Sequence, residues 1–235
     1  VVSTSDASPV LRVRAAFVAT AVAEFFRDQG DEVLLLVDST TRIAMAQREI
    51  GLAAGEPPTT KGYPPSSFSL LPKLLERSGR TAKGSITGVY TVLVEGDDIT
   101  EPVADATRGV LDGHLWLSRS LSNRGQYPAI AVLESISRMM PDIVDDEHQQ
   151  AAARLRRVLA VWEDIEDLVN VGAYAAGANV EFDVAVQMSA KIDELLRQGV
   201  QQSAEFSDTR QRLLDLAAQC ATLEEQLQKK VKRSA

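Results

Sequence analysis

This sequence lacks several features that mark other classes of protein. It has one cysteine, Cys220, so it cannot form an internal disulfide framework, and this usage fits a reducing compartment. No stretch approaches the ~20 consecutive apolar residues of a membrane-spanning helix. Residues 1–4 have neither the basic start nor the following apolar core of a signal peptide. With 25 Lys and Arg against 33 Asp and Glu, the net charge of −8 argues against nucleic acid as a main partner.

A glycine-rich phosphate-binding loop of the form G-x-x-x-x-G-K-[S/T] is also missing. Residues 79–85 have its two glycines at the correct spacing, but Ser85 stands in the place of the obligatory lysine. The segment also precedes a predicted strand, whereas a phosphate-binding loop follows one. We therefore predict that residues 79–85 do not bind phosphate.

What is present is the composition of an ordinary globular protein, with 45% apolar and 25% charged residues. The length of 235 residues suggests one or two domains. In the first part of the chain, strand and helix patterns alternate, which predicts an α/β fold with a mostly parallel sheet and helices on both faces. The expected helices cover 11–29, 42–50, 66–77 and 101–111, the expected strands cover 33–37, 85–95 and 114–117, and Val1–Val2 has the character of a strand end.

After Pro141 the strand signals stop and helical periodicity takes over. The helical segments are 151–171, 182–197 and 209–228. We therefore predict an all-α carboxy-terminal domain. The boundary is expected near 142–146, which gives an α/β part over residues 1–143 and a helical domain over residues 144–235.

Residues 51–65 form a long connection that contains four prolines and three glycines. Prolines lack a backbone donor and restrict the residues before them, so we expect no regular structure and few internal hydrogen bonds here. We also expect poor order unless neighbouring molecules cover the segment. A loop of this length inside a compact domain is usually functional or disordered.

The chemically most informative feature is the end of the strand at 33–37. This short apolar strand ends in Asp38, so it delivers a carboxylate to the sheet edge where α/β proteins bind ligands. From the residues alone, two roles are open for Asp38: capping the next helix, or holding the magnesium ion of a bound nucleotide. Arg42, one helical turn further along, has the alternative role of an ion-pair partner.

Tyr127 and Arg138 also have ordinary interpretations. Tyr127 precedes a proline in a loop, where an aromatic side chain usually packs, and Arg138 lies near the domain boundary, where a single arginine is usually an ion-pair partner. Neither histidine, His114 or His148, has a partner at metal-ligand spacing, and Cys220 has no base nearby in sequence. These three residues therefore indicate no metal centre and no cysteine nucleophile.

Several local patterns are jointly distinctive. They are Phe26–Gly30, Leu34–Arg42, Gly51–Ser66, Tyr90–Asp98, Leu111–His114 and Tyr127–Pro141. Together they resemble the flagellar and type III secretion export ATPases, which are relatives of the catalytic and regulatory subunits of rotary ATP synthases. The resemblance covers essentially the whole chain. Within it, the proline-rich run 51–66 marks the export branch, and Glu166–Tyr174 is closer to the flagellar than to the injectisome pattern.

The resemblance implies a partial RecA-like ATPase domain over 1–143, from the Walker B strand to the arginine finger, followed by the helical domain. Asp38 matches the Walker B aspartate, which holds Mg²⁺ through water. Arg138 matches the arginine finger that reaches nucleotide bound by the neighbouring subunit, and Tyr127 matches the aromatic residue that stacks on adenine. We place Arg42 beside Asp38 and Arg138 among the candidate catalytic residues. The implied cofactors are ATP and Mg.

The family also implies a setting. Its members are expected in the cytoplasm, peripheral at the inner-membrane export apparatus. They form homohexamers, and their partners are stalk and regulator proteins, export chaperones and export substrates. Nucleic acid is not an expected partner. The expected function is therefore a flagellum-specific protein export ATPase that delivers and unfolds export substrates. The alternatives are an injectisome ATPase, or a non-catalytic helical module for partner binding on a remnant ATPase scaffold. A rotary ATPase subunit is disfavoured by the proline-rich run 51–66.

Parts of the family pattern are not found in this sequence. The amino-terminal β-barrel, the P-loop lysine and threonine, and the glutamate that activates water are all expected upstream of Val1. We therefore expect this chain to be a carboxy-terminal fragment that does not hydrolyse ATP alone.

Overall fold

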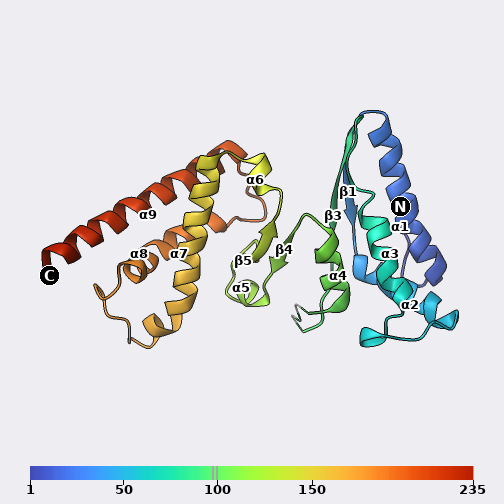
Figure 1. Ribbon diagram of the computed structural model, residues 1–235, viewed down its shortest axis with the longest axis horizontal. Helices are drawn as coiled ribbons and strands as arrows, with labels where there is room; N and C mark the ends of the chain where they lie inside the picture. The colour runs from blue at the N-terminus through green and yellow to red at the C-terminus, as the bar shows by residue number, and fades with distance from the viewer. Residues whose placement is uncertain (97, 99, 235) are drawn as a thin grey trace. The chain divides into compact units, whose positions relative to one another are not determined.

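The computed structural model describes residues 1–96, 98 and 100–234. It divides into two compact units, Val1–Asp112 and Gly113–Ala235. Figure 1 shows strands and helices together in the first unit, and a β-hairpin with long helices in the second. The predicted order of an α/β part followed by a helical part is confirmed.

The amino-terminal unit contains the following elements in chain order: α1 (Pro9–Asp28), β1 (Glu32–Val37), α2 (Thr40–Ala53), the 3₁₀ helix η1 (Thr60–Gly62), α3 (Pro65–Leu75), β2 (Gly79–Arg80), β3 (Ser85–Tyr90) and α4 (Pro102–Val110). The helices and strands predicted here are present, with shifted ends. Two details of the prediction are wrong: β3 ends at Tyr90 and does not continue to Glu95, and Val1–Val2 is not in a strand.

Local capping explains where these helices begin. The Ser8 hydroxyl accepts a hydrogen bond from the Leu11 amide at 3.4 Å, and Pro9 occupies the first position of α1. At α4, the Glu101 carboxylate accepts from the Ala104 amide at 2.8 Å. Both caps satisfy amides that the first helical turn leaves without a partner.

The sheet of this unit is small and mixed. Its strand order is β1-β3-β2, with β1 and β3 parallel from the pair Glu32–Ser85 to the pair Val37–Tyr90. β2 runs antiparallel to β3, so residues 79–85 form a tight connection between these two strands. A parallel pair is thus present, but the expectation of a mostly parallel sheet is only partly met.

One face of β1 is packed and the other is open within the described residues. Leu35 is 8% exposed and packs with Ala23 of α1, whereas Leu34 and Leu36 are 63% and 68% exposed. Alternate strand residues point to opposite faces, so this difference assigns the two faces directly. Helices on both faces were predicted; α1 covers one face, and no described helix of the amino-terminal unit covers the face that bears Leu34 and Leu36.

Residues 51–65 have more structure than the sequence predicts. α2 continues to Ala53, and η1 forms a further turn at Thr60–Gly62. The Thr59 amide donates to the Tyr63 carbonyl at 2.9 Å, and the Tyr63 amide donates to the Thr60 carbonyl at 3.1 Å. The expectation of little regular structure and few internal hydrogen bonds is therefore wrong for this segment.

Tyr63 is the reason that the connection is anchored. Its side chain is only 5% exposed, and its ring packs against Phe68 with the ring centroids 5.9 Å apart. The Arg48 guanidinium lies 5.3 Å from the centroid of the Tyr63 ring, in a cation–π contact. A single aromatic residue thus fixes a proline-rich segment to the core.

The start of α3 is fixed by a close approach of α2. A Cβ atom on Gly51 would lie 2.7 Å from Cγ of Pro64 and 2.8 Å from Oγ of Ser66, so only glycine fits without a shift. Ser66 lies in the first turn of α3, and its amide donates to the Glu56 carboxylate at 3.1 Å. The cap is therefore supplied from the preceding loop.

The carboxy-terminal unit contains β4 (Gly113–Leu117), α5 (Arg119–Asn123), β5 (Ile130–Ser137), α6 (Met140–Ile143), α7 (Asp146–Asn170), α8 (Val180–Leu196) and α9 (Phe206–Ser234). The strand β5 was not predicted. β4 and β5 form a separate two-stranded antiparallel sheet. The predicted helices of this unit correspond to α7, α8 and α9.

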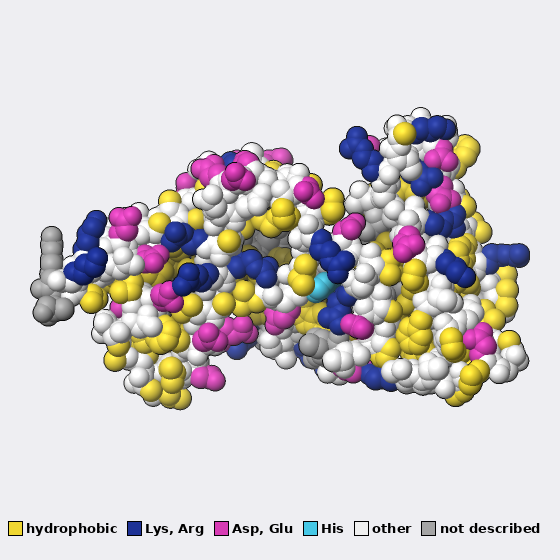
Figure 2. All heavy atoms as spheres, viewed as in Figure 1, with side chains coloured by type: hydrophobic (Ala, Val, Ile, Leu, Met, Phe, Trp, Pro, Cys, Tyr) yellow, Lys and Arg dark blue, Asp and Glu magenta, His cyan; other side chains and the backbone are white. Residues whose placement is uncertain are grey.

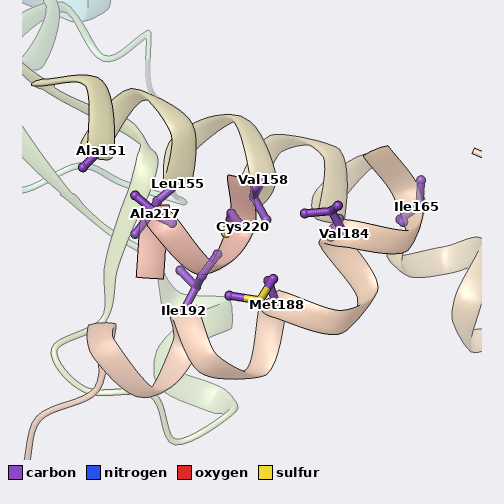
Figure 3. Packing of buried hydrophobic residues seen from close by; sticks show 10 residues of the cluster. Ala151, Leu155, Val158, Ile165, Val184, Met188, Ile192, Ala217 and Cys220 are labelled. Carbon is purple, nitrogen blue, oxygen red and sulfur yellow. The ribbon is translucent and has the colours of Figure 1, made fainter. Parts of the chain in front are cut away.

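The helices α7, α8 and α9 enclose one apolar core, in which the side chains point toward one another (Figure 3). Its buried members are Ala151, Leu155, Val158, Ile165, Val184, Ala185, Met188, Ile192, Ala217 and Cys220. Cys220 is 1% exposed and lies in this core, which agrees with a packing role. Burial raises the pKa of its thiol.

Charges surround this core. Arg210 of α9 pairs with Asp145 at 2.7 Å and with Glu147 at 3.2 Å, which joins the start of α9 to the start of α7. Figure 2 shows acidic and basic side chains interspersed over the helical bundle on the visible face.

Among the described helices, none combines the length and the apolar character needed to cross a membrane.

The division into compact units differs from the predicted domain boundary. The chain divides between Asp112 and Gly113, because the β4–β5 hairpin contacts α7 and belongs with the helices. The boundary at 143/144 remains a prediction about the family's domain organisation.

Candidate functional site

The sequence-predicted site residues fall in both compact units. Asp38 and Arg42 belong to the amino-terminal unit, and Tyr127 and Arg138 belong to the carboxy-terminal unit. The structure places the members of each pair in the same unit.

Asp38 lies at the carboxyl end of β1, where the register of the sheet places Thr91 beside it. Oδ1 of Asp38 accepts a hydrogen bond from the Thr91 hydroxyl at 2.8 Å. The Thr91 amide donates to the Val37 carbonyl at 3.0 Å, and the Thr40 amide donates to the Thr91 carbonyl at 2.9 Å. Three hydrogen bonds therefore tie the ends of β1 and β3 together around the carboxylate.

The cap of α2 is Ser39 and not Asp38. The Ser39 hydroxyl accepts from the Arg42 amide at 3.4 Å, and Ser39 is 2% exposed. The peptide bond between Asp38 and Ser39 is cis. Capping was one of the two roles left open for Asp38, and the structure gives that role to its neighbour.

A cavity of about 240 Å³ borders this end of the sheet. Asp38, Arg42 and Arg12 contribute to its lining, and Arg12 is paired with Glu49 at 2.7 Å. Asp38 and Arg42 are both exposed. A carboxylate and a guanidinium that line one cavity can contact cationic and anionic groups of a ligand.

The side chains available as metal ligands limit the kind of metal site that Asp38 could form. Among the described residues, no group of three or more His, Cys, Asp and Glu side chains is arranged to hold a metal ion. Asp38 is a single carboxylate with one oxygen engaged by Thr91. Mg²⁺ usually keeps several waters and binds through one or two carboxylates plus substrate phosphates, so Asp38 fits a contact to nucleotide-bound Mg²⁺ through water.

Tyr127 lies in the loop between α5 and β5 and is 52% exposed. Its hydroxyl is 3.0 Å from the Ser122 hydroxyl, and its carbonyl accepts from the Gln198 amide at 2.8 Å. The backbone is thus held while the residue stays about half exposed. This arrangement does not match the core-packing alternative, and a half-exposed ring can stack on a planar ligand.

Arg138 directly follows β5 and precedes α6. The last residue of the strand, Ser137, pairs with Gly113 of β4. Arg138 is exposed. Its place at the end of a paired strand gives its backbone a defined position and leaves its side chain at the surface.

Sequence reasoning missed several residues that organise these positions. Thr91 could have been found only from the register of β1 against β3, because the pair Val37–Tyr90 places the next residues, Asp38 and Thr91, opposite each other. Arg124, which pairs with Glu166 of α7 at 3.0 Å, also has no local sequence signal.

Two known families match successive parts of the chain. The nucleotide-binding domain of the ATP synthase alpha/beta family matches residues 1–137. The carboxy-terminal domain of the type III secretion ATPase EscN matches residues 144–215.

Curated relatives have names from two export systems. The flagellum-specific ATP synthase of Bacillus subtilis is 54% identical over 87% of this chain and 47% of its own length. The type 3 secretion system ATPase of Xanthomonas euvesicatoria is 53% identical over 89% of this chain and 47% of its own length. The chain therefore spans about half the length of the curated relatives that it matches.

Solved structures give the same result. The assembled ATPase EscN from the type III secretion system of enteropathogenic E. coli is 43% identical, with a TM-score of 0.89 over 92% of this chain and 52% of that chain. EscN in complex with its central stalk EscO is 42% identical, with a TM-score of 0.84 over 92% of this chain and 51% of that chain.

Proposed function

Because the chain belongs to the flagellar and type III secretion branch of the ATP synthase alpha/beta family, we propose that it serves ATP-driven protein export. The observation that carries the proposal is Asp38 at the end of β1, where it accepts a hydrogen bond from Thr91 and lines a cavity. This position matches the Walker B aspartate of the family. The helix cap is supplied by Ser39, so capping does not account for Asp38.

Each site residue has one proposed role. Asp38 holds the Mg²⁺ of bound ATP through water, and Mg²⁺ when bound supplies positive charge against the phosphates. Arg42 adds positive charge at the same cavity. Tyr127 stacks its accessible ring on adenine.

Arg138 acts as the arginine finger on nucleotide bound by the adjacent subunit. A guanidinium supplied across an interface stabilises charge on the transferring phosphoryl group and is worth roughly 10³–10⁵ in rate. Positioning and electrostatics supply nearly all the catalysis of phosphoryl transfer, so a surface arginine on a defined backbone suits this role.

We propose the flagellar system as the setting, on the resemblance of Glu166–Tyr174, with the injectisome as the second candidate. The comparisons do not separate the two, since relatives from both systems are 54% and 53% identical. The proposed place of action is the cytoplasm, at the periphery of the inner-membrane export apparatus.

The proposed assembly is a homohexamer that meets a central stalk. The similarity to the assembled ATPase EscN, and to EscN in complex with its central stalk EscO, supports a ring and a stalk partner for this chain. Regulators, chaperones and export substrates are the further partners that the family implies.

The test of the finger role uses an active background. We define the joined ATPase as a polypeptide that joins these 235 residues to a P-loop-bearing amino-terminal half from a family member. In it, Arg138→Ala should lower the turnover of ATP on the order of 10³-fold, with folding and nucleotide binding retained. If Arg138 is instead a structural ion-pair partner, its loss should lower the melting temperature and reduce activity only in proportion.

A mixing experiment tests action between subunits. Arg138→Ala subunits are mixed with subunits that lack the P-loop lysine, so that some interfaces combine an intact P-loop with an intact finger. Recovery of turnover supports the proposal. Failure to recover, together with a clear loss of thermal stability in Arg138→Ala, contradicts it.

A further inference from the structure

A bulge in β5 of the β4–β5 hairpin precedes Arg138 in the chain and contacts the helix α7. The register pairs His114 with Ile136, and then Trp116 with Ala131. Residues 132–135 of β5 therefore have only Leu115 opposite them. Their backbone groups are left out of the ladder, and such groups need other partners when they are not fully hydrated.

Two side chains contact the carbonyl groups of residues 132–135. The Arg156 guanidinium donates to the carbonyls of Val132 at 2.8 Å, Leu133 at 3.1 Å and Ser135 at 3.2 Å. Nε2 of His114 lies 2.8 Å from the carbonyl of Glu134. Every carbonyl of the bulge thus has a side-chain partner, and Arg156 supplies three of the four.

Ser135 closes the bulge from within. Its hydroxyl accepts from the Trp116 amide at 2.9 Å and donates to the Ala131 carbonyl at 2.6 Å. Ser135 is 8% exposed, so these hydrogen bonds are shielded from water. The bulge is therefore a defined structure and not an irregular loop.

Arg156 belongs to α7, so these contacts tie the helical bundle to the strand that leads into Arg138. Bulges characteristically re-aim the residues that follow them. Ser137 rejoins the ladder opposite Gly113, and Arg138 comes next. The direction in which Arg138 leaves the hairpin depends on how the bulge is held.

The same helix also holds the Tyr127 loop. Glu166, farther along α7, pairs with Arg124 at 3.0 Å. Arg124 lies in the same loop as Tyr127, shortly before it in the sequence. The Gln198 amide, just after α8, donates to the Tyr127 carbonyl. The helical bundle thus contacts both segments that carry the proposed nucleotide-facing residues of this unit.

We propose that Arg156 is a positioning residue that holds the β5 bulge and thereby sets the placement of Arg138. The α7 helix then transmits a displacement of the helical bundle to the finger. The role of Arg138 rests on the proposed function, whereas the hold of Arg156 on the bulge does not. Arginine suits this position because its planar fork can donate to several carbonyls at once, which a lysine ammonium does less well.

The first experiment uses the 235-residue chain itself and measures amide hydrogen exchange of residues 130–137. Arg156→Ala should accelerate exchange in this segment on the order of tenfold, and Arg156→Lys should restore part of the protection. The matched control is Arg157→Ala, which removes the same charge from the same helix but pairs with Glu181 of α8. Equal protection in the wild type and Arg156→Ala overturns the proposal.

The second experiment is a double-mutant cycle in the joined ATPase. Arg156→Ala should lower kcat on the order of 10- to 100-fold with a smaller change in KM, since a small misplacement of a catalytic group has this effect. In the Arg138→Ala background it should lower kcat no further. A merely structural role would reduce activity equally in both backgrounds, and that additive result overturns the proposal.

The two proposals fail in different ways. If Arg138→Ala leaves kcat unchanged, the finger role fails, while hydrogen exchange still reports whether Arg156 holds the bulge. If Arg138→Ala lowers kcat but Arg156→Ala changes neither kcat nor exchange, only the positioning role fails.

Discussion

The Thr91 hydroxyl donates to Oδ1 of Asp38 at 2.8 Å, across the carboxyl ends of two parallel strands. The bond fixes one carboxylate oxygen and orients the other. A preorganised acid needs no rearrangement when a ligand arrives, which is how active sites use hydrogen-bonded neighbours. Thr91 is therefore a testable part of the proposed magnesium contact.

We predict that Thr91→Val lowers ATP turnover by the joined ATPase about tenfold, which corresponds to the loss of one charge-assisted hydrogen bond. Valine keeps the branched shape and removes only the donor. Thr91→Ser keeps the hydroxyl and is the matched control, with turnover expected near that of the parent. Steady-state hydrolysis at saturating Mg²⁺ and ATP measures both. Equal turnover in the valine and serine variants would remove Thr91 from the site.

The chain of 235 residues by itself is predicted not to hydrolyse ATP measurably. Its sequence contains no P-loop motif, and phosphoryl transfer depends on groups that position the phosphates. Phosphate release from the purified chain is the measurement. Magnesium-dependent hydrolysis that copurifies with the chain and disappears in Asp38→Asn would show that the prediction is wrong.

Asp183 is predicted to hold the connection between α7 and α8. It is 5% exposed, it accepts from the Tyr174 hydroxyl, and both carboxylate oxygens lie 3.0 Å from the Gly177 amide. Asp183→Ala should lower the free energy of unfolding by about 2–3 kcal/mol, because it removes charge-assisted bonds and leaves donors unpaired. Tyr174→Phe should cost about 1 kcal/mol, since only one hydrogen bond is lost.

Urea unfolding followed by tryptophan fluorescence is suited to this test. Both tryptophans, Trp116 and Trp162, lie in the carboxy-terminal unit, so the signal reports on that unit. Burial and the bond to Asp183 raise the pKa of Tyr174 to about 12, so the phenol remains the donor throughout the neutral range. A midpoint for Asp183→Ala equal to that of the wild type would contradict the assignment.

Asp193 is predicted to make the stability of the helical unit depend on pH. Burial raises the pKa of its carboxyl above the ordinary value, although the charge of Arg197 opposes the shift. The folded state therefore binds the proton more tightly than the unfolded state. The free energy of unfolding falls as the pH rises from the unfolded-state pKa, about 3.9, through the raised folded-state pKa. At higher pH it stays at this lower level.

Asp193→Asn should consequently melt at a higher temperature than the wild type at pH 7. The difference should vanish below about pH 3.9, where both forms are neutral. Asp164→Asn, at an exposed position on α7, removes the same charge and is the control. A melting temperature for Asp193→Asn at or below that of the wild type at pH 7 would refute the prediction.

The order of helices and strands follows from the sequence because it rests on local signals. The apolar run 33–37 and the helical periodicity after Pro141 each indicate their element within a few residues. The family resemblance likewise rests on short motifs that can be read directly. Asp38, Tyr127 and Arg138 are candidate residues because they lie within those motifs.

The connection at 51–65 shows where local signals fail. Prolines and glycines predict irregular chain, but Tyr63 reaches the core and fixes the segment. Whether an aromatic residue finds a pocket depends on residues outside its own segment, here Phe68 and Arg48. The conformational propensity of a segment depends on its own residues, whereas the burial of Tyr63 depends on the residues that pack around it.

The sequence by itself determined the family and the order of an α/β part followed by helices, and it provided Asp38, Tyr127 and Arg138 as candidate site residues. Only the tertiary structure decided that Ser39 and not Asp38 caps α2, that Thr91 holds the Asp38 carboxylate, and that Arg156 holds the bulge of β5. The physical reason is that strand register and helix packing create contacts between residues far apart in the chain. A side chain shows its type in the sequence, but its hydrogen-bond partner exists only after folding.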